Sequence, residues 1–249
     1  MPVMEFSEYK NMAAAAAETI AKQAQKEIKE KGYFTIVLSG GGSPRMIYEK
    51  LAAEPLKSAV EWEKVFIFWG DERFVEKTNN DSNYRMANEA FVSKVGVPED
   101  NVFPIPVEEK SPEKTAEVYE NTLRDFFKAP ENKEAGTKFP AFDLILLGVG
   151  ADGHTASLFP GNVALNEKKK WVVRVKAHAR VTLRDRITMT MPVLSSGKKV
   201  MFIISGYGKG EILKSIFRGP EKVKKQYPAG MLNEEGPGSV WYIDKGIYG

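Results

Sequence analysis

Short apolar runs that alternate with amphipathic segments restrict the fold of this chain more than any other feature. Runs of strand length lie at Tyr33–Leu38, Val65–Trp69 and Phe142–Leu147. The last run is apolar apart from Asp143, as is typical of strands buried on both faces. Segments with helical periodicity separate the runs. This alternation predicts an α/β protein, a three-layer αβα Rossmann-like domain with a mostly parallel sheet covered by helices on both faces.

The same patterns place the other elements. We expect helices over 8–31, capped by Ser7 and ended by Gly32, and over Pro44–Ala53, Ser82–Val95, a segment from Ser111-Pro112, and Gly208–Phe217. Further strands are expected at Trp171–Val175, Ile187–Met191, Val200–Ile204 and Val240–Ile243, and polar loops at Gly70–Asp81 and Lys128–Lys138. No linker or repeat divides the chain, so residues 1–249 are expected to form one domain.

Composition excludes several classes of function. The chain has no cysteine, which excludes disulfides, thiolate metal sites and cysteine nucleophiles. Its two histidines, His154 and His178, are too few for a metal cage of several imidazoles. The formal net charge of +3 is too small to indicate nucleic-acid binding. No apolar stretch approaches the ~20 residues that cross a bilayer, so we expect a cytoplasmic protein without a membrane partner.

Three loops follow strands, at the edge of a parallel sheet where ligands bind. The first loop is Ser39–Pro44, and its glycines are Gly40, Gly41 and Gly42. Consecutive glycines let the backbone approach a ligand, and the next helix presents free N–H groups, which suits a phosphate. The alternative is an ordinary tight turn. The loop is not a Walker A motif, because no Gly-Lys-Ser/Thr follows.

The second loop, Gly70–Arg73, places two carboxylates and a guanidinium after an apolar strand. An arginine there could form paired hydrogen bonds with a carboxylate or phosphate, or stabilise a developing oxyanion. The alternative is a charged turn that only meets solvent.

The third loop, Gly148–His154, matches the G-x-G-x-x-G pattern of dinucleotide-binding proteins. We reject that interpretation because Pro160-Gly161 leaves no room for a full helix and the expected ribose-binding acid is missing. The loop instead delivers His154 as a candidate general base, with Asp152 able to orient its ring. The alternative is a histidine that makes only structural hydrogen bonds.

Two later cations complete the set of candidate residues. Arg186 opens a strand, and Lys209 lies at a glycine-rich junction between strand and helix. Both could neutralise a phosphate dianion. His178 lies among other basic residues, where a surface role is expected.

Together these segments resemble the 6-phosphogluconolactonase family, within the glucosamine-6-phosphate isomerase/6-phosphogluconolactonase superfamily. The most specific match is Asp152–Gly161, which reads DGHTASLFPG. The other matching segments are Leu38–Pro44, Trp69–Val75, Ser82–Tyr84, Phe142–Leu144, Arg186–Leu194, Gly206–Lys209, Tyr227–Ala229 and Trp241–Asp244.

Some positions depart from the family pattern, and none removes a candidate catalytic group. Gly42-Ser43 stands where the family usually has Ser-Thr, so a hydroxyl is kept at Ser43. The other departures are Glu76 and Ala151 at common proline positions and Ser195 at a common asparagine. The segment from Arg180 nearly copies the Arg186 motif, so either arginine could face the ligand, and the residues that follow Arg186 favour it.

The resemblance implies hydrolysis of 6-phospho-D-glucono-1,5-lactone to 6-phospho-D-gluconate, in the oxidative pentose phosphate pathway. It implies no metal, no cofactor and no obligate protein partner. His154 would take a proton from the attacking water, Asp152 would orient His154, and Arg73 would stabilise the oxyanion or hold the substrate. The phosphate would bind the Gly40–Ser43 backbone, with Lys209 and Arg186.

Two alternatives remain open at this point. The superfamily also contains glucosamine-6-phosphate isomerases/deaminases, which carry a glutamate shortly after Asp-Gly-His, whereas Thr155–Phe159 contains no acid. Their second loop ends in Asp-Glu-Tyr, where this chain has Arg73, and both differences favour the lactonase. The other alternative is a sugar-phosphate sensor without chemistry, which would not need His154 beside Asp152.

Overall fold

A seven-stranded sheet forms the centre of the computed structural model, which describes residues 2–127, 139–178, 183–235 and 238–248. Every pairing in this sheet is parallel, so the expected α/β class with a mostly parallel sheet is confirmed. The strands are, in order across the sheet, β1 (Val3–Phe6), β10 (Ser239–Asp244), β9 (Val200–Ile204), β6 (Leu144–Leu147), β2 (Phe34–Leu38), β3 (Val65–Trp69) and β5 (Val102–Phe103).

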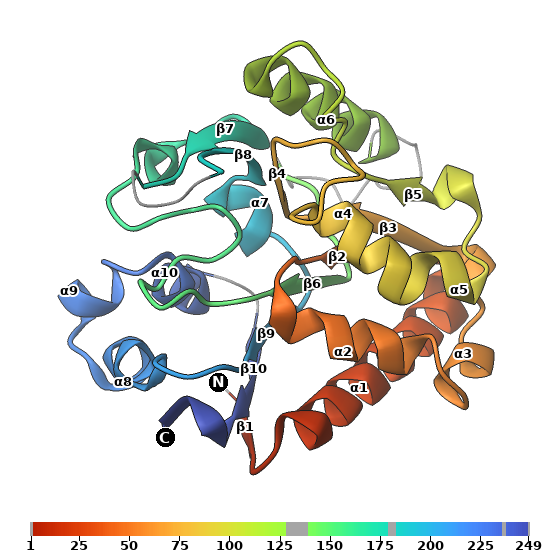
Figure 1. Ribbon diagram of the computed structural model, residues 1–249, viewed down its shortest axis with the longest axis horizontal. Coiled ribbons are helices and arrows are strands. Elements are labelled where there is room, and N and C mark those ends of the chain that lie inside the picture. The colour runs from red at the N-terminus through yellow and green to blue at the C-terminus, as the bar shows by residue number, and fades with distance from the viewer. Residues whose placement is uncertain (1, 128–138, 179–182, 236–237, 249) are drawn as a thin grey trace.

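The middle strands are buried on both faces, which explains why their sequences are almost wholly apolar. Every residue of β2, β6 and β9 is buried. Helices supply the cover: α1 and α2 lie on one side of the sheet, and α8 and α10 on the other (Figure 1). The helices are α1 (Tyr9–Lys31), α2 (Gly42–Leu51), α3 (Leu56–Ala59), α4 (Asn83–Ala87), α5 (Ser93–Val95), α6 (Pro112–Phe127), α7 (Met191–Ser195), α8 (Gly210–Arg218), α9 (Glu221–Lys224) and α10 (Pro228–Glu235).

Helix ends differ from the expectations, most clearly at the starts of α1 and α2. The capping residue of α1 is Glu8 and no side chain caps it, so the expected cap by Ser7 is wrong. Helix α2 begins at Gly42 rather than Pro44, which brings the end of the glycine loop into the first turn of the helix. Gly32 ends α1 in the left-handed conformation, as expected, with φ of 90°.

A second, three-stranded sheet corrects two expectations. It contains β4 (Asp71–Arg73), β8 (Asp185–Met189) and β7 (Val172–Lys176), all antiparallel. The segment expected as a polar loop therefore begins with a strand, and the two strands expected in the parallel sheet leave it. The connection between β7 and β8 is too short for the crossover that parallel neighbours need. Strand β8 also stops two residues early, because Pro192 lies at the start of α7.

Some elements carried no usable sequence signal, and some expectations fall outside the described residues. Strands β1 and β5 are short and lie at the two edges of the sheet, so they lack a long apolar run. The expected loop Lys128–Lys138 and residue Arg180 lie outside the described residues. In the part of the chain that the structure describes, no helix combines the length and apolar character that crossing a membrane requires.

Candidate active site

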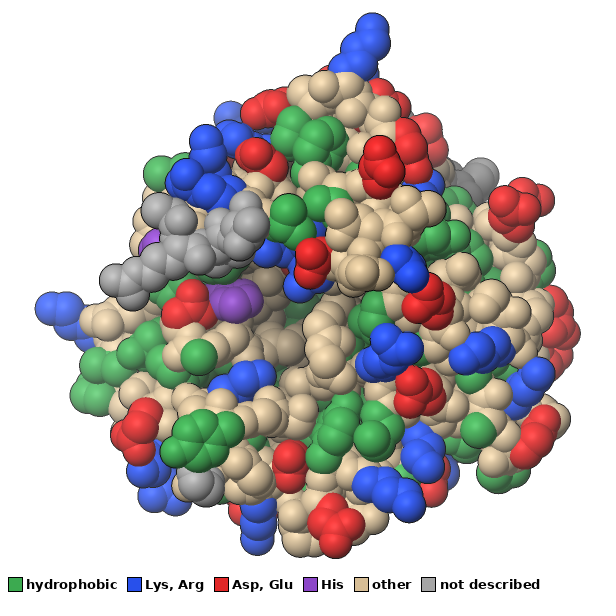
Figure 2. Space-filling model, viewed as in Figure 1, with side chains coloured by type: hydrophobic (Ala, Val, Ile, Leu, Met, Phe, Trp, Pro, Cys, Tyr) green, Lys and Arg blue, Asp and Glu red, His purple; other side chains and the backbone are tan. Residues whose placement is uncertain are grey.

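One cavity of about 320 Å³ opens where the two sheets meet, at the carboxyl ends of the parallel strands. Figure 2 shows a histidine at the rim of a hollow with basic side chains beside it. All but one of the candidate residues from the sequence line this cavity: Gly40, Gly41, Gly42, Ser43, Arg73, His154, Arg186 and Lys209. The exception is Asp152, whose side chain contacts the ring of His154.

The edge of the large sheet contributes backbone groups and one cation. The loop after β2 enters α2, whose first N–H groups have no partners within the helix. Tyr9 fixes this turn, because its hydroxyl donates to the carbonyl of Ser43 at 2.6 Å. The hydroxyl of Ser43 lies 2.8 Å from that of Ser205 and so connects the turn to the loop after β9. That connection brings a helix N-terminus and the Lys209 loop to one side of the cavity.

Gly40 is required by packing as well as by its place beside the ligand. A Cβ atom at this position would lie 1.7 Å from Oδ1 of Asn83. Asn83 is buried, and its Nδ2 donates to the backbone oxygen of Asp71 at 2.9 Å. The missing side chain at Gly40 therefore lets the glycine loop pack directly on the start of α4, which also lines the cavity.

Lys209 is a half-buried cation at the start of α8. Burial lowers the pKa of its ammonium group, because leaving water disfavours the charged form. No carboxylate among the described residues forms an ion pair with it. A cation held without a partner at the wall of a cavity is suited to an anionic ligand.

The small sheet contributes side chains to the cavity. Successive side chains of β4 point to opposite faces of the sheet, so only alternate residues face the cavity. Asp71 and Arg73 line the cavity, whereas Glu72 points to the opposite face and is buried. Glu72 accepts hydrogen bonds from three backbone N–H groups and from the hydroxyl of Ser82. Burial raises the pKa of Glu72, and those N–H groups oppose the rise. Glu72 therefore holds the start of α4 in place and does not face the ligand.

Two arginines lie directly opposite one another on adjacent strands of the small sheet. Arg73 of β4 pairs in register with Arg186 of β8. Like charges in this arrangement are destabilising unless an anion lies between them. Burial and the charge of Arg73 lower the pKa of Arg186, whose buried Nε has no hydrogen-bond partner. The pair therefore favours an anionic ligand or a developing negative charge in the cavity.

His154 and Asp152 form a hydrogen-bonded pair at the rim. Nδ1 of His154 lies 2.5 Å from Oδ1 of Asp152, and the same oxygen accepts the backbone N–H of His154 at 3.1 Å. Burial alone would raise the pKa of Asp152, but the contacts with His154 lower it below its usual value. A hydrogen bond from Nδ1–H to the carboxylate of Asp152 leaves Nε2 as the ring nitrogen that can accept a proton.

Gly150 makes room for this pair. A Cβ atom there would lie 2.1 Å from the ring of His154 and 2.8 Å from Oδ1 of Asp152. The backbone closes the loop on itself, because the N–H of Gly150 donates to the carbonyl of His154 at 2.9 Å. The ring of Phe159 packs against the imidazole at 4.8 Å between centroids. These contacts give the His154 ring a fixed place in the cavity wall.

Sequence reasoning missed several residues of the cavity wall, above all Asp71. Its carboxylate accepts a hydrogen bond from the hydroxyl of Ser157 at 2.6 Å and is the one anionic group among the described residues that line the cavity. Ala156 precedes Ser157 with a left-handed φ of 47°. The alternation Asp71-Glu72-Arg73 could have revealed Asp71, had this segment been recognised as a strand with Asp71 and Arg73 on one face.

His178 does not line this cavity. Within the described ranges, no group of three or more histidine and carboxylate side chains is placed to hold a metal ion. The arrangement can therefore bind an anion through backbone N–H groups and cations, and can exchange a proton at Nε2 of His154.

Comparisons with known proteins show what the chain is similar to. A family model described as glucosamine-6-phosphate isomerases/6-phosphogluconolactonase matches residues 7–241. The chain is 41% identical over 226 residues to a 6-phosphogluconolactonase of Synechocystis sp., covering 91% of this chain and 88% of that protein. It is 39% identical to 6-phosphogluconolactonase 3, chloroplastic, of Arabidopsis thaliana, covering 94% and 70%. The solved 6-phosphogluconolactonase from Trypanosoma brucei superposes with a TM-score of 0.85 at 28% identity, over 99% and 97% of the two chains.

Proposed function

The chain belongs to the family of glucosamine-6-phosphate isomerases and 6-phosphogluconolactonases, and we propose that it is a 6-phosphogluconolactonase. Its reaction would be the hydrolysis of 6-phospho-D-glucono-1,5-lactone to 6-phospho-D-gluconate, within the oxidative pentose phosphate pathway. The observation that carries the proposal is the pairing of His154 with Asp152 at the wall of a cavity that also holds three cations.

The first step is attack of water on the lactone. Nε2 of neutral His154 takes a proton from the water as its oxygen bonds to C1, and Asp152 stabilises the imidazolium that forms. The carbonyl oxygen becomes an oxyanion, which the guanidinium of Arg73 stabilises. The tetrahedral intermediate then collapses, the bond from C1 to the ring oxygen breaks, and His154 returns the proton to that oxygen. General acid–base catalysis of this kind supplies a rate increase of about 10²- to 10⁴-fold.

Binding of the phosphate group uses the other side of the cavity. The N–H groups at the start of α2 and the ammonium of Lys209 bind the dianion, and Arg186 adds a second cation. This binding energy acts far from C1, so it positions the reacting carbon beside His154. The proposed route passes through no metal ion.

The isomerase/deaminase reaction of the same family is the alternative, and this chain lacks features on which it depends. The segment Thr155–Phe159 carries no acid that could help His154 open a sugar ring. Ser157 of that segment instead donates to Asp71, and Thr155 donates to the carbonyl of Gly148. Both hydroxyls are used in fixing the cavity wall.

A rate assay on freshly generated lactone tests the proposal. We expect hydrolysis well above the spontaneous rate, unchanged by a chelator, and no ammonia release from glucosamine 6-phosphate. A rate equal to spontaneous opening would support the sensor alternative, and ammonia release would support the deaminase. The cytoplasmic location stays a prediction, since one of the similar relatives is chloroplastic.

A further inference from the structure

A second cavity of about 280 Å³ adjoins the first and has no part in the proposed reaction. The two cavities share Phe159, whose ring lies 4.8 Å from the ring of His154 and 6.1 Å from that of His178. Phe159 therefore forms a wall with one histidine on each side of it.

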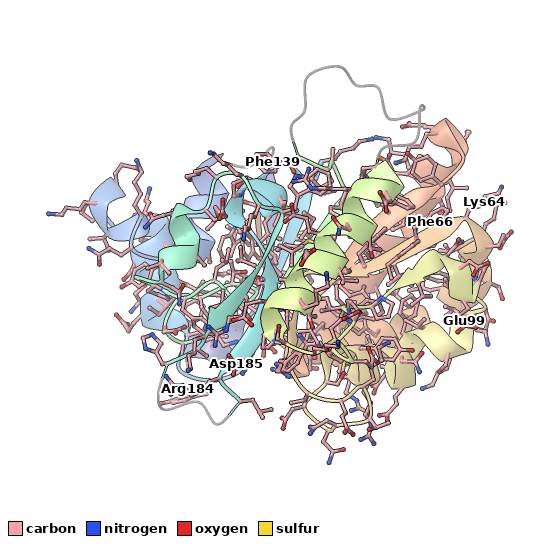
Figure 3. The ribbon with its side chains drawn as sticks, turned by 90° about the horizontal axis from the view of Figure 1, so that it is seen from above. Lys64, Phe66, Glu99, Phe139, Arg184 and Asp185 are labelled. Atoms are coloured by element: carbon pink, nitrogen blue, oxygen red, sulfur yellow. The ribbon has the colours of Figure 1, made fainter. Side chains whose placement is uncertain are left out.

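Among the described residues that line the second cavity, three are basic and none is acidic. The basic residues are Lys176, His178 and Arg184. Among the described residues, none of the three forms an ion pair. Asp185 adjoins Arg184 in the chain (Figure 3), but its carboxylate is engaged with the guanidinium of Arg174, at 2.5 Å. No ion pair within the described ranges therefore neutralises the basic residues of this cavity.

Backbone pairing fixes the positions of these cations. Lys176 ends β7, and Arg184 immediately precedes β8. Lys176 lies opposite Asp185 in the antiparallel ladder, and the N–H of Ala177 donates to the carbonyl of Arg184 at 2.8 Å. This pairing fixes the backbone of both basic residues at one end of the small sheet.

We propose that this cavity is a second anion-binding site, which takes the phosphate group of a small phosphate monoester. Lysine and arginine donate charge-assisted hydrogen bonds to phosphate oxygens, and the imidazole of His178 adds an N–H donor. The site is separate from the active cavity and does not depend on the proposed lactonase function. A bound dianion would contact His178 on one side of Phe159 while His154 stays free on the other.

The two histidines make a direct experiment possible, because the whole chain contains no others. Inorganic phosphate is titrated into the protein at constant ionic strength, and the two imidazole C–H signals are followed by NMR. We expect a saturable shift of the His178 signal. The double variant Lys176→Gln/Arg184→Gln should weaken this response at least about tenfold. Lys22→Gln, which removes a charge from the exposed face of α1, should leave it unchanged.

A further variant separates the second site from the active cavity. Phosphate also binds at Lys209 under the proposed function, and that event is expected to shift the His154 signal. Lys209→Gln should weaken the His154 response and leave the His178 response intact. The proposal is overturned if His178 does not respond, if its response survives the double variant, or if it disappears with Lys209→Gln. Because no lactone is used, none of these results depends on lactonase activity.

Discussion

The large and small sheets contribute to the same cavity in different ways. The large sheet ends there in loops that offer backbone N–H groups and Lys209, whereas the small sheet places Asp71, Arg73 and Arg186 on one of its faces. The loop with His154 and Asp152 follows the large sheet and packs against the small one through Ser157 and Asp71. We infer that the large sheet binds the phosphate group and the small sheet, with the His154 loop, serves the reacting carbon.

The largest effect is expected from His154→Asn. Loss of the proton acceptor should lower kcat by about 10²- to 10⁴-fold and change KM little, because His154 lies at the reacting end of the cavity. Asp152→Asn keeps the ring but removes the carboxylate that orients it, so an intermediate loss is expected. Steady-state kinetics measure both variants, and unfolding midpoints check that they fold. A wild-type kcat for His154→Asn would refute the assignment of the base.

A smaller effect of a different kind is expected from Lys209→Gln. It should lower kcat/KM for the phosphorylated lactone by about 10- to 100-fold, mainly through KM, because one charge-assisted contact with the phosphate is lost. The same enzyme should hydrolyse unphosphorylated glucono-1,5-lactone at the wild-type rate. Equal losses on both lactones would show that Lys209 acts on the reacting carbon, and that the two ends of the cavity are not separate.

Lys209 should also lower the stability of the free protein. Burial lowers its pKa, so the folded state holds the lysine proton less tightly than the unfolded state does. The charged form then costs stability in full below that lowered pKa, and the cost disappears above the unfolded value of about 10.4. Lys209→Met should therefore raise the free energy of unfolding near pH 7 by about 0.5 to 1 kcal/mol.

Urea unfolding across pH 7 to 10.5 measures this difference. The gap between Lys209→Met and wild type should narrow as the solution becomes more alkaline. Lys22→Met, at an exposed position of α1, should show little change at either end of the range. A gap that widens with pH would contradict the burial of an unpaired cation.

The smallest effect is expected at Ala156, whose left-handed backbone lies where the two sheets meet. Glycine adopts this conformation without strain but has more freedom in the unfolded state, so Ala156→Gly should change stability by less than about 1 kcal/mol. Ala16→Gly in the buried face of α1 should cost about 1 kcal/mol or more. Thermal unfolding compares the two. An equal loss for both would mean that position 156 carries no strain.

The central strands of the large sheet were predictable from sequence, whereas the small sheet was not, because β7 and β8 were expected in the large sheet and β4 was expected to be a loop. Strands such as β6 are buried on both faces, so their apolar runs predict them from the sequence alone. Strand β4 is three residues long and wholly charged, which is the pattern of a loop until its partner β8 is known. For the same reason the sequence identified Arg73 as a candidate but missed Asp71 on the same face. Such strands form only by pairing with segments that are distant in the chain, and no local sequence pattern predicts them.

The central claim is that phosphate and reacting carbon occupy opposite ends of one cavity, and the position of bound 6-phosphogluconate tests it most directly. In a crystal structure of that complex, we expect the phosphate within hydrogen-bond distance of Lys209 and the first turn of α2. The C1 carboxylate should lie beside Nε2 of His154 and the guanidinium of Arg73. A product bound in the reverse direction, or outside this cavity, would contradict the account.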